Sequence, residues 1–301
     1  MATNLLRQIR QAVEQLNPNE VRETAERPII FRINATSEGY AEIEDFLAPR
    51  TISRNKRLEI MQWIYRAEDP SIPETTDLDV YELGLPLPEG AFVFDPSTPP
   101  QLVADVLAVK QELGLPLARC FPPFRKSVAD KVIFDVSKEN ALFAIMTAMP
   151  DLMPGIALPW SIPEAMSDAA VLTINQIRMA FLLAAASDRP VGYREQKTEI
   201  ASIIAGAVGW RALARNLVGK IPLGGGILAK AGVAFAATYV EGLSLERLYR
   251  VGYGYTRAER QLAYGAALAR GRQVANALWN SIRRKRGERM YEQAMGIHPS
   301  P

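Results

Sequence analysis

One stretch of the chain, Glu199 to Tyr255, constrains the fold more than any other. It is dense in Gly, Ala and branched aliphatic residues, is poor in charge, and is interrupted by a single turn, Ile221–Gly226 (Ile-Pro-Leu-Gly-Gly-Gly). Small residues allow helix axes to approach closely. The composition therefore predicts two helices that fold back on each other and pack backbone against backbone.

The same stretch raises the question of a membrane span, which needs roughly 18 or more residues nearly free of charge. The longest charge-free run in the chain is Leu152–Pro163, twelve residues with three prolines. Within the stretch, Arg211, Arg215, Lys230 and Glu241 would each cost about 2.5–3.5 kcal/mol at the centre of a bilayer. We therefore expect a helical hairpin in a bundle that rests on a membrane rather than crosses it.

Composition excludes several kinds of site. The 301 residues include one cysteine, Cys120, and one histidine, His298. An internal disulfide, a thiolate metal cluster, a Ser-His triad and a multi-histidine metal site therefore cannot be built, and a reducing compartment is indicated. The sequence predicts neither a cofactor nor a metal. The N-terminal residues 1–17 alternate charged and apolar side chains, which predicts an amphipathic helix and not a signal peptide.

Charge is spread unevenly although the net charge is only +2. Residues 69–112 carry nine acidic residues and one basic, whereas residues 265–301 carry seven basic and two acidic. A basic run follows the apolar spacing of the final helix: Arg283, Arg284, Lys285 and Arg286. Such a segment suits an anionic membrane surface or an acidic protein groove, and plain solvated surface is the simpler interpretation. No motif for nucleic-acid binding accompanies it.

Periodicity predicts an α+β chain that is mostly α. Buried strands are expected at 29–34, 91–95 and 115–120, with at most one further short strand at 79–83. Helices between them are expected at 18–26, 40–47, 54–67, 99–113 and from 128 onward. Short apolar strands separated by helices indicate a small parallel α/β layer.

After residue 138 the sequence predicts only helices, at 140–149, 163–186, 195–217, 226–242 and 256–289. Breaks are expected at Pro150, at Asp188–Pro190, at Pro222 and at Gly252 with Gly254. We therefore expect two domains, an α/β domain over 1–138 and a helical bundle with a basic C-terminal helix over 139–301.

The segment Asn34–Ala41 lies where a strand–loop–helix would hold a phosphate. Compared with the phosphate-loop pattern, only Gly39 is retained, and Tyr40 and Ala41 replace the lysine and the hydroxyl residue that the chemistry requires. Nucleotide hydrolysis is therefore not expected.

Two further groups are candidates for interaction. Asn175 and Arg178 share a face of an apolar helix, so they either form hydrogen bonds between helices, with Arg178 paired to Asp168, Asp151 or Glu199, or meet a partner. Gly224, Gly225 and Gly226 precede a helix, so they either make a tight turn or offer N–H groups to an anion. Tyrosines near 239–264 fit a membrane-interface belt or the end of a bundle equally well.

The helical half also carries a series of motifs in a fixed order: NQIRMA at 175–180, GWRALAR at 209–215, KIPLGGG at 220–226, and then AT at 237–238 and EG at 241–242. Over residues 140–255 this series resembles the domain-of-unknown-function family found C-terminal to Era-like small GTPase domains and in YcjF-like inner-membrane proteins. The resemblance implies a helical, membrane-associated domain with no established activity, which links a GTPase to the membrane or to a partner. Beside such a domain, the α/β half over 1–138 looks like a GTPase-like remnant that has lost its phosphate-binding residues.

The resulting hypothesis is a non-enzymatic adaptor, peripheral on the cytoplasmic side of the inner membrane, with a protein partner and with self-association left open. Two alternatives stay open. The first is a soluble cytoplasmic interaction protein whose apolar helices form its core. The second is an atypical nucleotide-binding hydrolase.

Overall fold

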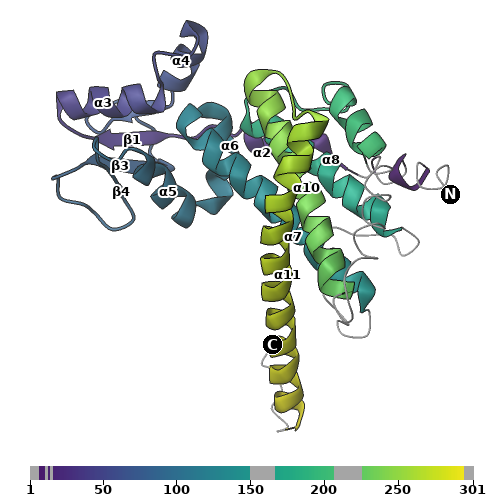
Figure 1. Cartoon of the computed structure of the whole chain (residues 1–301). Helices are drawn as coiled ribbons and strands as arrows, with labels where there is room; N and C mark the ends of the chain where they lie inside the picture. The colour runs from purple at the N-terminus through teal and green to yellow at the C-terminus, as the bar shows by residue number, and fades with distance from the viewer. Residues whose placement is uncertain (1–6, 11–12, 14–15, 150–166, 207–225, 295–301) are drawn as a thin grey trace. The chain divides into compact units, whose positions relative to one another are not determined.

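The computed structural model describes residues 7–10, 13, 16–149, 167–206 and 226–294 (Figure 1). It is mostly helical with one small parallel sheet, which confirms the α+β class. Two compact units are present, a sheet unit (17–132 and 181–196) and a helical unit (1–16, 133–180 and 197–301). Neither unit is one continuous stretch, whereas the sequence analysis placed a single boundary near residue 138.

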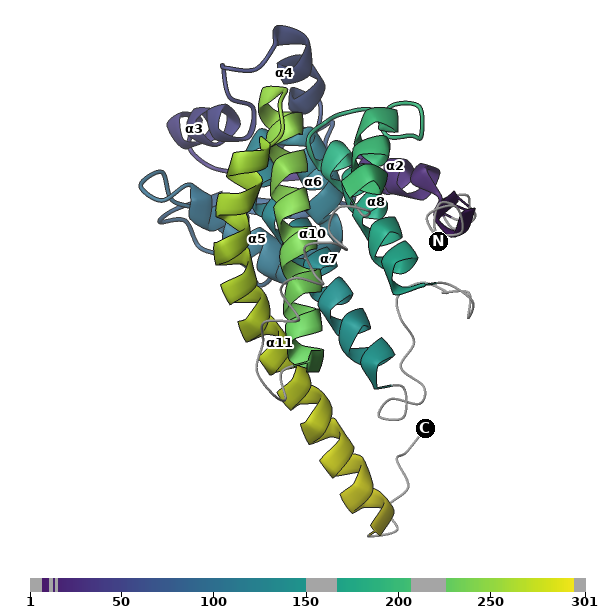
Figure 2. The ribbon, with the colours of Figure 1, turned by 45° about the vertical axis from the view of Figure 1, so that its right-hand side comes forward.

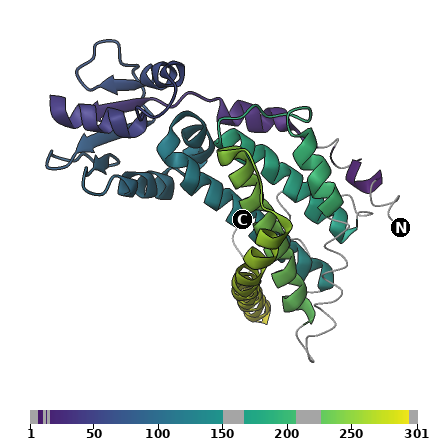
Figure 3. The same cartoon turned by 45° about the horizontal axis from the view of Figure 1, so that its top comes forward.

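The sheet unit is built on four parallel strands in the order β2-β1-β3-β4 (Figures 1 and 3). Phe31 of the central strand is in register with Ile64 on one side and Leu78 on the other. The strands are β1 (Phe31–Asn34), β2 (Ile64–Arg66), β3 (Leu78–Glu82) and β4 (Phe92–Phe94). The predicted strands at 29–34, 79–83 and 91–95 are thus confirmed.

The two faces of this sheet differ. Phe31 and Ile33 are 0% and 1% exposed on one face, where they join the core of the unit. On the other face, Arg32 and Asp79 form a half-exposed ion pair, and Arg32 Nε donates to Asp79 Oδ1 at 2.9 Å. Strand side chains alternate between faces, so this parallel sheet has one buried and one partly polar face.

Helices α2 to α5 of the sheet unit begin at polar caps or prolines. Asn17 accepts a hydrogen bond from the N–H of Asn19, Thr36 from Gly39 and Ser53 from Lys56, as N-cap side chains do. The α-helices are α2 (Pro18–Ala25), α3 (Ser37–Leu47), α4 (Arg54–Met61), α5 (Pro100–Val109) and α6 (Gly114–Cys120), with 3-10 turns η1 (Gln111–Leu113) and η2 (Pro122–Phe124).

Two predictions in this unit were wrong. Residues 115–120 were expected to be a strand but form α6, because Pro116 lies in the first helical turn, where its missing N–H costs nothing. The helix expected over 54–67 ends at Met61, and Ile64 begins β2. Its supposed apolar face is not buried, since Leu58 is 58% exposed.

The helical unit contains the second part of α7 (Arg125–Ala148), most of α8 (Asp168–Ala186), a helix whose described part is 197–206, α10 (Gly226–Val251) and α11 (Arg257–Ala294). The expected breaks at Asp188–Pro190 and at Gly252 are present, and Gly252 has φ 90°. Residues 7–10 and 13 are helical, and Ile9 is buried, as an amphipathic N-terminal helix predicts.

Helices α10 and α11 lie side by side as an antiparallel pair (Figure 2). A Cβ placed on Gly271 would lie 2.6 Å from the carbonyl oxygen of Gly232, so the backbones are in direct contact here. Phe235, Ala275 and neighbouring apolar residues continue the interface. Close packing through small residues was predicted for Glu199–Tyr255. The close packing that the structure describes is between α10 and α11, and α11 lies outside that stretch. The turn at Ile221–Gly226 lies outside the described residues except for Gly226.

Candidate functional site

The predicted polar residues of α8 face α7 inside the helical unit. Asn175 is 1% exposed, and its Nδ2 donates to Oδ1 of Asn140 at 2.6 Å. Arg178 forms an ion pair with Glu139. Burial raises the pKa of Glu139 above its usual value, and the positive charge of Arg178 offsets only part of that rise. These are the expected bonds between helices.

Arg178 pairs with Glu139, which was not among the carboxylates proposed for it; Asp151, one of those proposed, lies outside the described residues. Asp168, one of the three carboxylates proposed for it, pairs instead with Lys230 of α10. Glu139 is one residue before Asn140, so the same turn of α7 receives both Asn175 and Arg178. Sequence spacing placed the two residues on one face correctly but could not identify the helix opposite.

A buried polar network connects three helices around these residues. Nδ2 of Asn140 donates to Oγ1 of Thr238 on α10 at 2.7 Å, and Nε2 of Gln176 reaches the same oxygen at 3.4 Å. Asn140 and Thr238 are 0% and 1% exposed. Polar groups satisfied in this way fix the register of helices, because any sliding would leave them unpaired.

One end of the helical unit brings three helix termini together, and we call it the Lys230 end. Nζ of Lys230 donates to Asp168 Oδ2 at 2.6 Å and to Thr147 Oγ1 at 3.3 Å. These residues lie near the end of α7, at the start of α8 and near the start of α10. Gly226 is the first residue of α10, and an added Cβ there would meet open space.

The basic run of α11 follows the residues of that helix that pack at the same end. Ile282 is the last α11 residue in the core cluster that contains Phe235, and Arg283 and Arg284 after it are exposed. Lys285 and Arg286 continue the helix, but their side chains lie outside the described residues. Also outside are four other candidates: Arg211, Arg215, Gly224 and Gly225.

The segment Asn34–Ala41 comprises the last residue of β1, a short loop and the start of α3. Here the carboxylate of Glu82 accepts a hydrogen bond from the N–H of Thr36 at 2.7 Å. A Cβ on Gly39 would lie 2.3 Å from Cδ of Glu82, so this carboxylate lies against the helix N-terminus. A phosphate would bind at this helix N-terminus, but the carboxylate of Glu82 already lies there.

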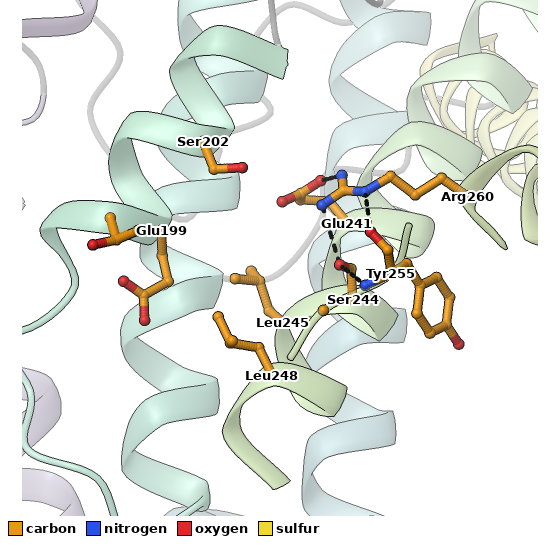
Figure 4. A pocket seen from close by; sticks show the side chains of 10 residues that line it. Glu199, Ser202, Glu241, Ser244, Leu245, Leu248, Tyr255 and Arg260 are labelled. Atoms are coloured by element: carbon orange, nitrogen blue, oxygen red, sulfur yellow. Dashed lines mark hydrogen bonds and ion pairs between the residues drawn. The ribbon is translucent and has the colours of Figure 1, made fainter. Parts of the chain in front are cut away.

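A pocket of about 250 Å³ opens at the other end of the α10–α11 pair (Figure 4). Thr198, Glu199 and Ser202 line it from the helix at 197–206. Figure 4 shows Leu245 and Leu248 of α10 between that side and the opposite wall. Three separate stretches of chain therefore build it, so no local sequence pattern indicates it.

The opposite wall is a hydrogen-bonded set around Arg260 of α11. Its guanidinium pairs with Glu241, whose side chain is 7% exposed, and donates from Nη2 to Ser244 Oγ at 3.1 Å. The N–H of Tyr255 donates to the same Ser244 oxygen at 2.9 Å. Gly254 permits this approach, since a Cβ there would lie 2.8 Å from Ser244 Oγ.

Other ionic contacts close the same end. Arg247 pairs with Glu259 at 2.6 Å, and its guanidinium lies 4.7 Å from the ring centroid of Tyr253. The hydrogen bond from Arg247 is the main cause that lowers the pKa of Glu259 to about 2. Tyr239, in contrast, stacks on Phe235 within the helix pair. The tyrosines thus lie partly at the end of the bundle and partly along it.

Within the described ranges, no group of three or more His, Cys, Asp or Glu side chains could hold a metal ion. Burial raises the pKa of the Cys120 thiol to about 11, so this residue is a poor nucleophile at neutral pH.

Two described helices are long and apolar enough to cross a membrane, α8 with a mean hydropathy of 1.5 and α10 with 1.2. Of their most apolar windows, 72% and 61% is buried inside the protein. The charges expected to oppose a span in α10 are both paired, Lys230 with Asp168 and Glu241 with Arg260. The helices are compatible with membrane association, and core helices of a soluble protein have the same properties.

Comparisons with family models, with curated proteins and with solved structures find no match for this chain.

Proposed function

We propose that this chain is a non-enzymatic, membrane-associated adaptor that docks on an anionic membrane surface through the Lys230 end of its helical unit. It is peripheral and on the cytoplasmic side in this proposal, and its other surfaces are left for a protein partner. The resemblance of residues 140–255 to GTPase-associated domains favours a small-GTPase system as the source of that partner.

The observation that carries the proposal is the continuation of α11. After Ile282 the helix runs on to Ala294, about 18 Å at 1.5 Å per residue (Figures 1 and 2). These twelve residues contain five Arg or Lys and two Glu, a net charge of +3. A basic side chain near an anionic bilayer contributes about 1 kcal/mol. The extension is therefore sufficient for reversible, salt-sensitive binding to such a surface.

Chain topology adds further groups at this end. The segment that contains the charge-free run 152–163 joins α7 to α8, and the segment before α10 contains Arg211, Arg215 and Lys220 with no acidic residue from 207 to 225. Thr147, Asp168 and Lys230, close to the points where these segments attach, are bonded to one another. The described residues next to these two segments thus lie together at this end of the unit.

Vesicle flotation of the full chain tests this proposal. We expect the protein to float with phosphatidylcholine vesicles that contain phosphatidylglycerol, to stay in solution with phosphatidylcholine alone, and to be released by added salt. Replacing the basic run with glutamine should abolish flotation. A control variant with the same loss of charge replaces four exposed basic residues at other places: Arg22, Arg54, Arg194 and Lys197.

Protein that stays wholly in solution with both kinds of vesicle would contradict docking. The high buried share of α8 and α10 would then favour the alternative, a soluble interaction protein. Equal flotation of the two variants would contradict the role of α11. Binding of GTP or ATP in isothermal titration would instead favour an atypical nucleotide-binding hydrolase.

A further inference from the structure

The pocket beside Arg260 carries an excess of negative charge. Arg260 is balanced by Glu241, and the nearby Arg247 is balanced by Glu259. Glu199, on the wall opposite Arg260, has no ion-pair partner among the described residues (Figure 4). The lining therefore holds two carboxylates against one guanidinium, a net charge of −1. A bound anion would be repelled by this negative charge, whereas a bound cation would neutralise it.

The volume of the pocket and its other lining residues restrict the chemical class of the ligand further. At about 250 Å³ the pocket is smaller than the roughly 300–1,000 Å³ of sites for drug-sized ligands, so it suits a group of only a few heavy atoms. Leu245 and Leu248 offer apolar surface between the two polar walls, and Ser202 adds a hydroxyl beside Glu199. One apolar surface next to one unpaired carboxylate matches a short hydrocarbon chain that ends in a positive charge.

We propose that this pocket binds an alkylammonium group, with its alkyl chain on Leu245 and Leu248 and its charge on the carboxylate of Glu199. The group can belong to a free amine or to a lysine side chain of a partner protein. The proposal is independent of the membrane-docking function, because the pocket lies at the end of the α10–α11 pair opposite to the Lys230 end.

Ligand-observed NMR titration of the full-length protein tests this with n-pentylammonium as the probe. We expect saturable binding of pentylammonium and weaker binding of its uncharged and anionic counterparts, pentanol and pentanoate. Glu199→Gln should weaken pentylammonium binding about two- to fivefold, the effect of one partly exposed ion pair. Glu42→Gln, at an exposed site on α3, removes the same charge and should leave binding unchanged.

A second variant tests the place of binding. Ser202 is exposed at the rim, so Ser202→Phe should fill the pocket without disturbing the core, and its helix content can be verified by circular dichroism. We expect it to abolish pentylammonium binding. N-acetyl-lysine methylamide then separates the two sources: binding equal to that of pentylammonium indicates a partner's lysine, and weaker binding indicates a free amine.

The proposal is overturned if pentylammonium does not bind at millimolar concentrations, if pentanoate binds more tightly, or if Glu199→Gln and Glu42→Gln have the same affinity as the unaltered protein. Undiminished binding to a folded Ser202→Phe variant would also overturn it.

Discussion

The contact between α10 and α11 gives a sharp test of the packing. In the unaltered protein the backbones touch because Gly271 has no side chain. Gly271→Ala would place a Cβ 2.6 Å from the carbonyl oxygen of Gly232 and 3.2 Å from Cβ of Phe235. Both helices would have to move, since the first obstacle is backbone and cannot rotate away.

The magnitude follows from that distance. Favourable contacts of carbon begin at about 3.5 Å, so the helices must separate by roughly 0.9 Å at this point. Overpacking of this kind costs about 1–3 kcal/mol. Alanine also gains about 0.8–1.0 kcal/mol over glycine in helix propensity. The matched control is Gly265→Ala, because Gly265 is in the interior of the same helix and a Cβ there meets nothing within 4 Å.

Equilibrium urea unfolding, followed by far-UV circular dichroism, measures both variants. The propensity gain is common to the two, so we expect Gly271→Ala to be less stable than Gly265→Ala by about 1–3 kcal/mol. Gly265→Ala should itself be slightly more stable than the unaltered protein. If Gly271→Ala matches or exceeds Gly265→Ala in stability, the backbones are not in contact at this position.

Three further predictions concern polar and titratable groups. Asn140→Ala should lower the free energy of unfolding by about 1–3 kcal/mol, because it leaves the buried amide of Asn175 without its acceptor; an unchanged urea midpoint would contradict the network. The Cys120 pKa of about 11 predicts that iodoacetamide alkylates this thiol slowly at pH 8 and faster as the pH rises. Mass spectrometry measures the rate, and a rate at pH 8 equal to that of a free thiol would refute the prediction. Because Arg247 lowers the pKa of Glu259 to about 2, the contribution of this pair to stability should be fully present above pH 4.5, the usual pKa, and be lost between pH 4.5 and 2. In thermal unfolding, Glu259→Gln should therefore depend less on acid in this window, and identical profiles would argue against the ion pair.

Local sequence pattern predicted those elements whose own residues carry a clear periodicity or composition. Apolar runs identified β1 and β4, and β3 was expected as at most one short strand. Small residues predicted close packing for α10, but the partner that they indicated was the helix before the Ile221–Gly226 turn, whereas the described partner is α11. The pattern failed where tertiary pairing decided the outcome. Ile64 has helical spacing from Met61, yet it pairs with Phe31 as a strand, and no sequence pattern near Ile64 indicates that partner.

The candidate sites show the same division. Spacing alone placed Asn175 and Arg178 on one face of α8. Their partners, Asn140 and Glu139, lie 35 and 39 residues earlier in the chain, and sequence gives no measure of that proximity. Glu241 was recognised only as a charge that opposes a membrane span. Its role in holding Arg260 at a pocket wall required the fold of three separate segments.

The carboxylate of Glu82 at the start of α3 has a consequence for any ligand of that loop. A tethered group acts at an effective concentration that reaches millimolar values for short flexible links, and an external anion must compete with it. Phosphate-bearing molecules would have to displace Glu82 from the N–H of Thr36 before they could bind. Glu82 thus occupies, within the sheet unit itself, the N–H group that an external anion would need, and this holds whatever residues stand at the other positions of the loop.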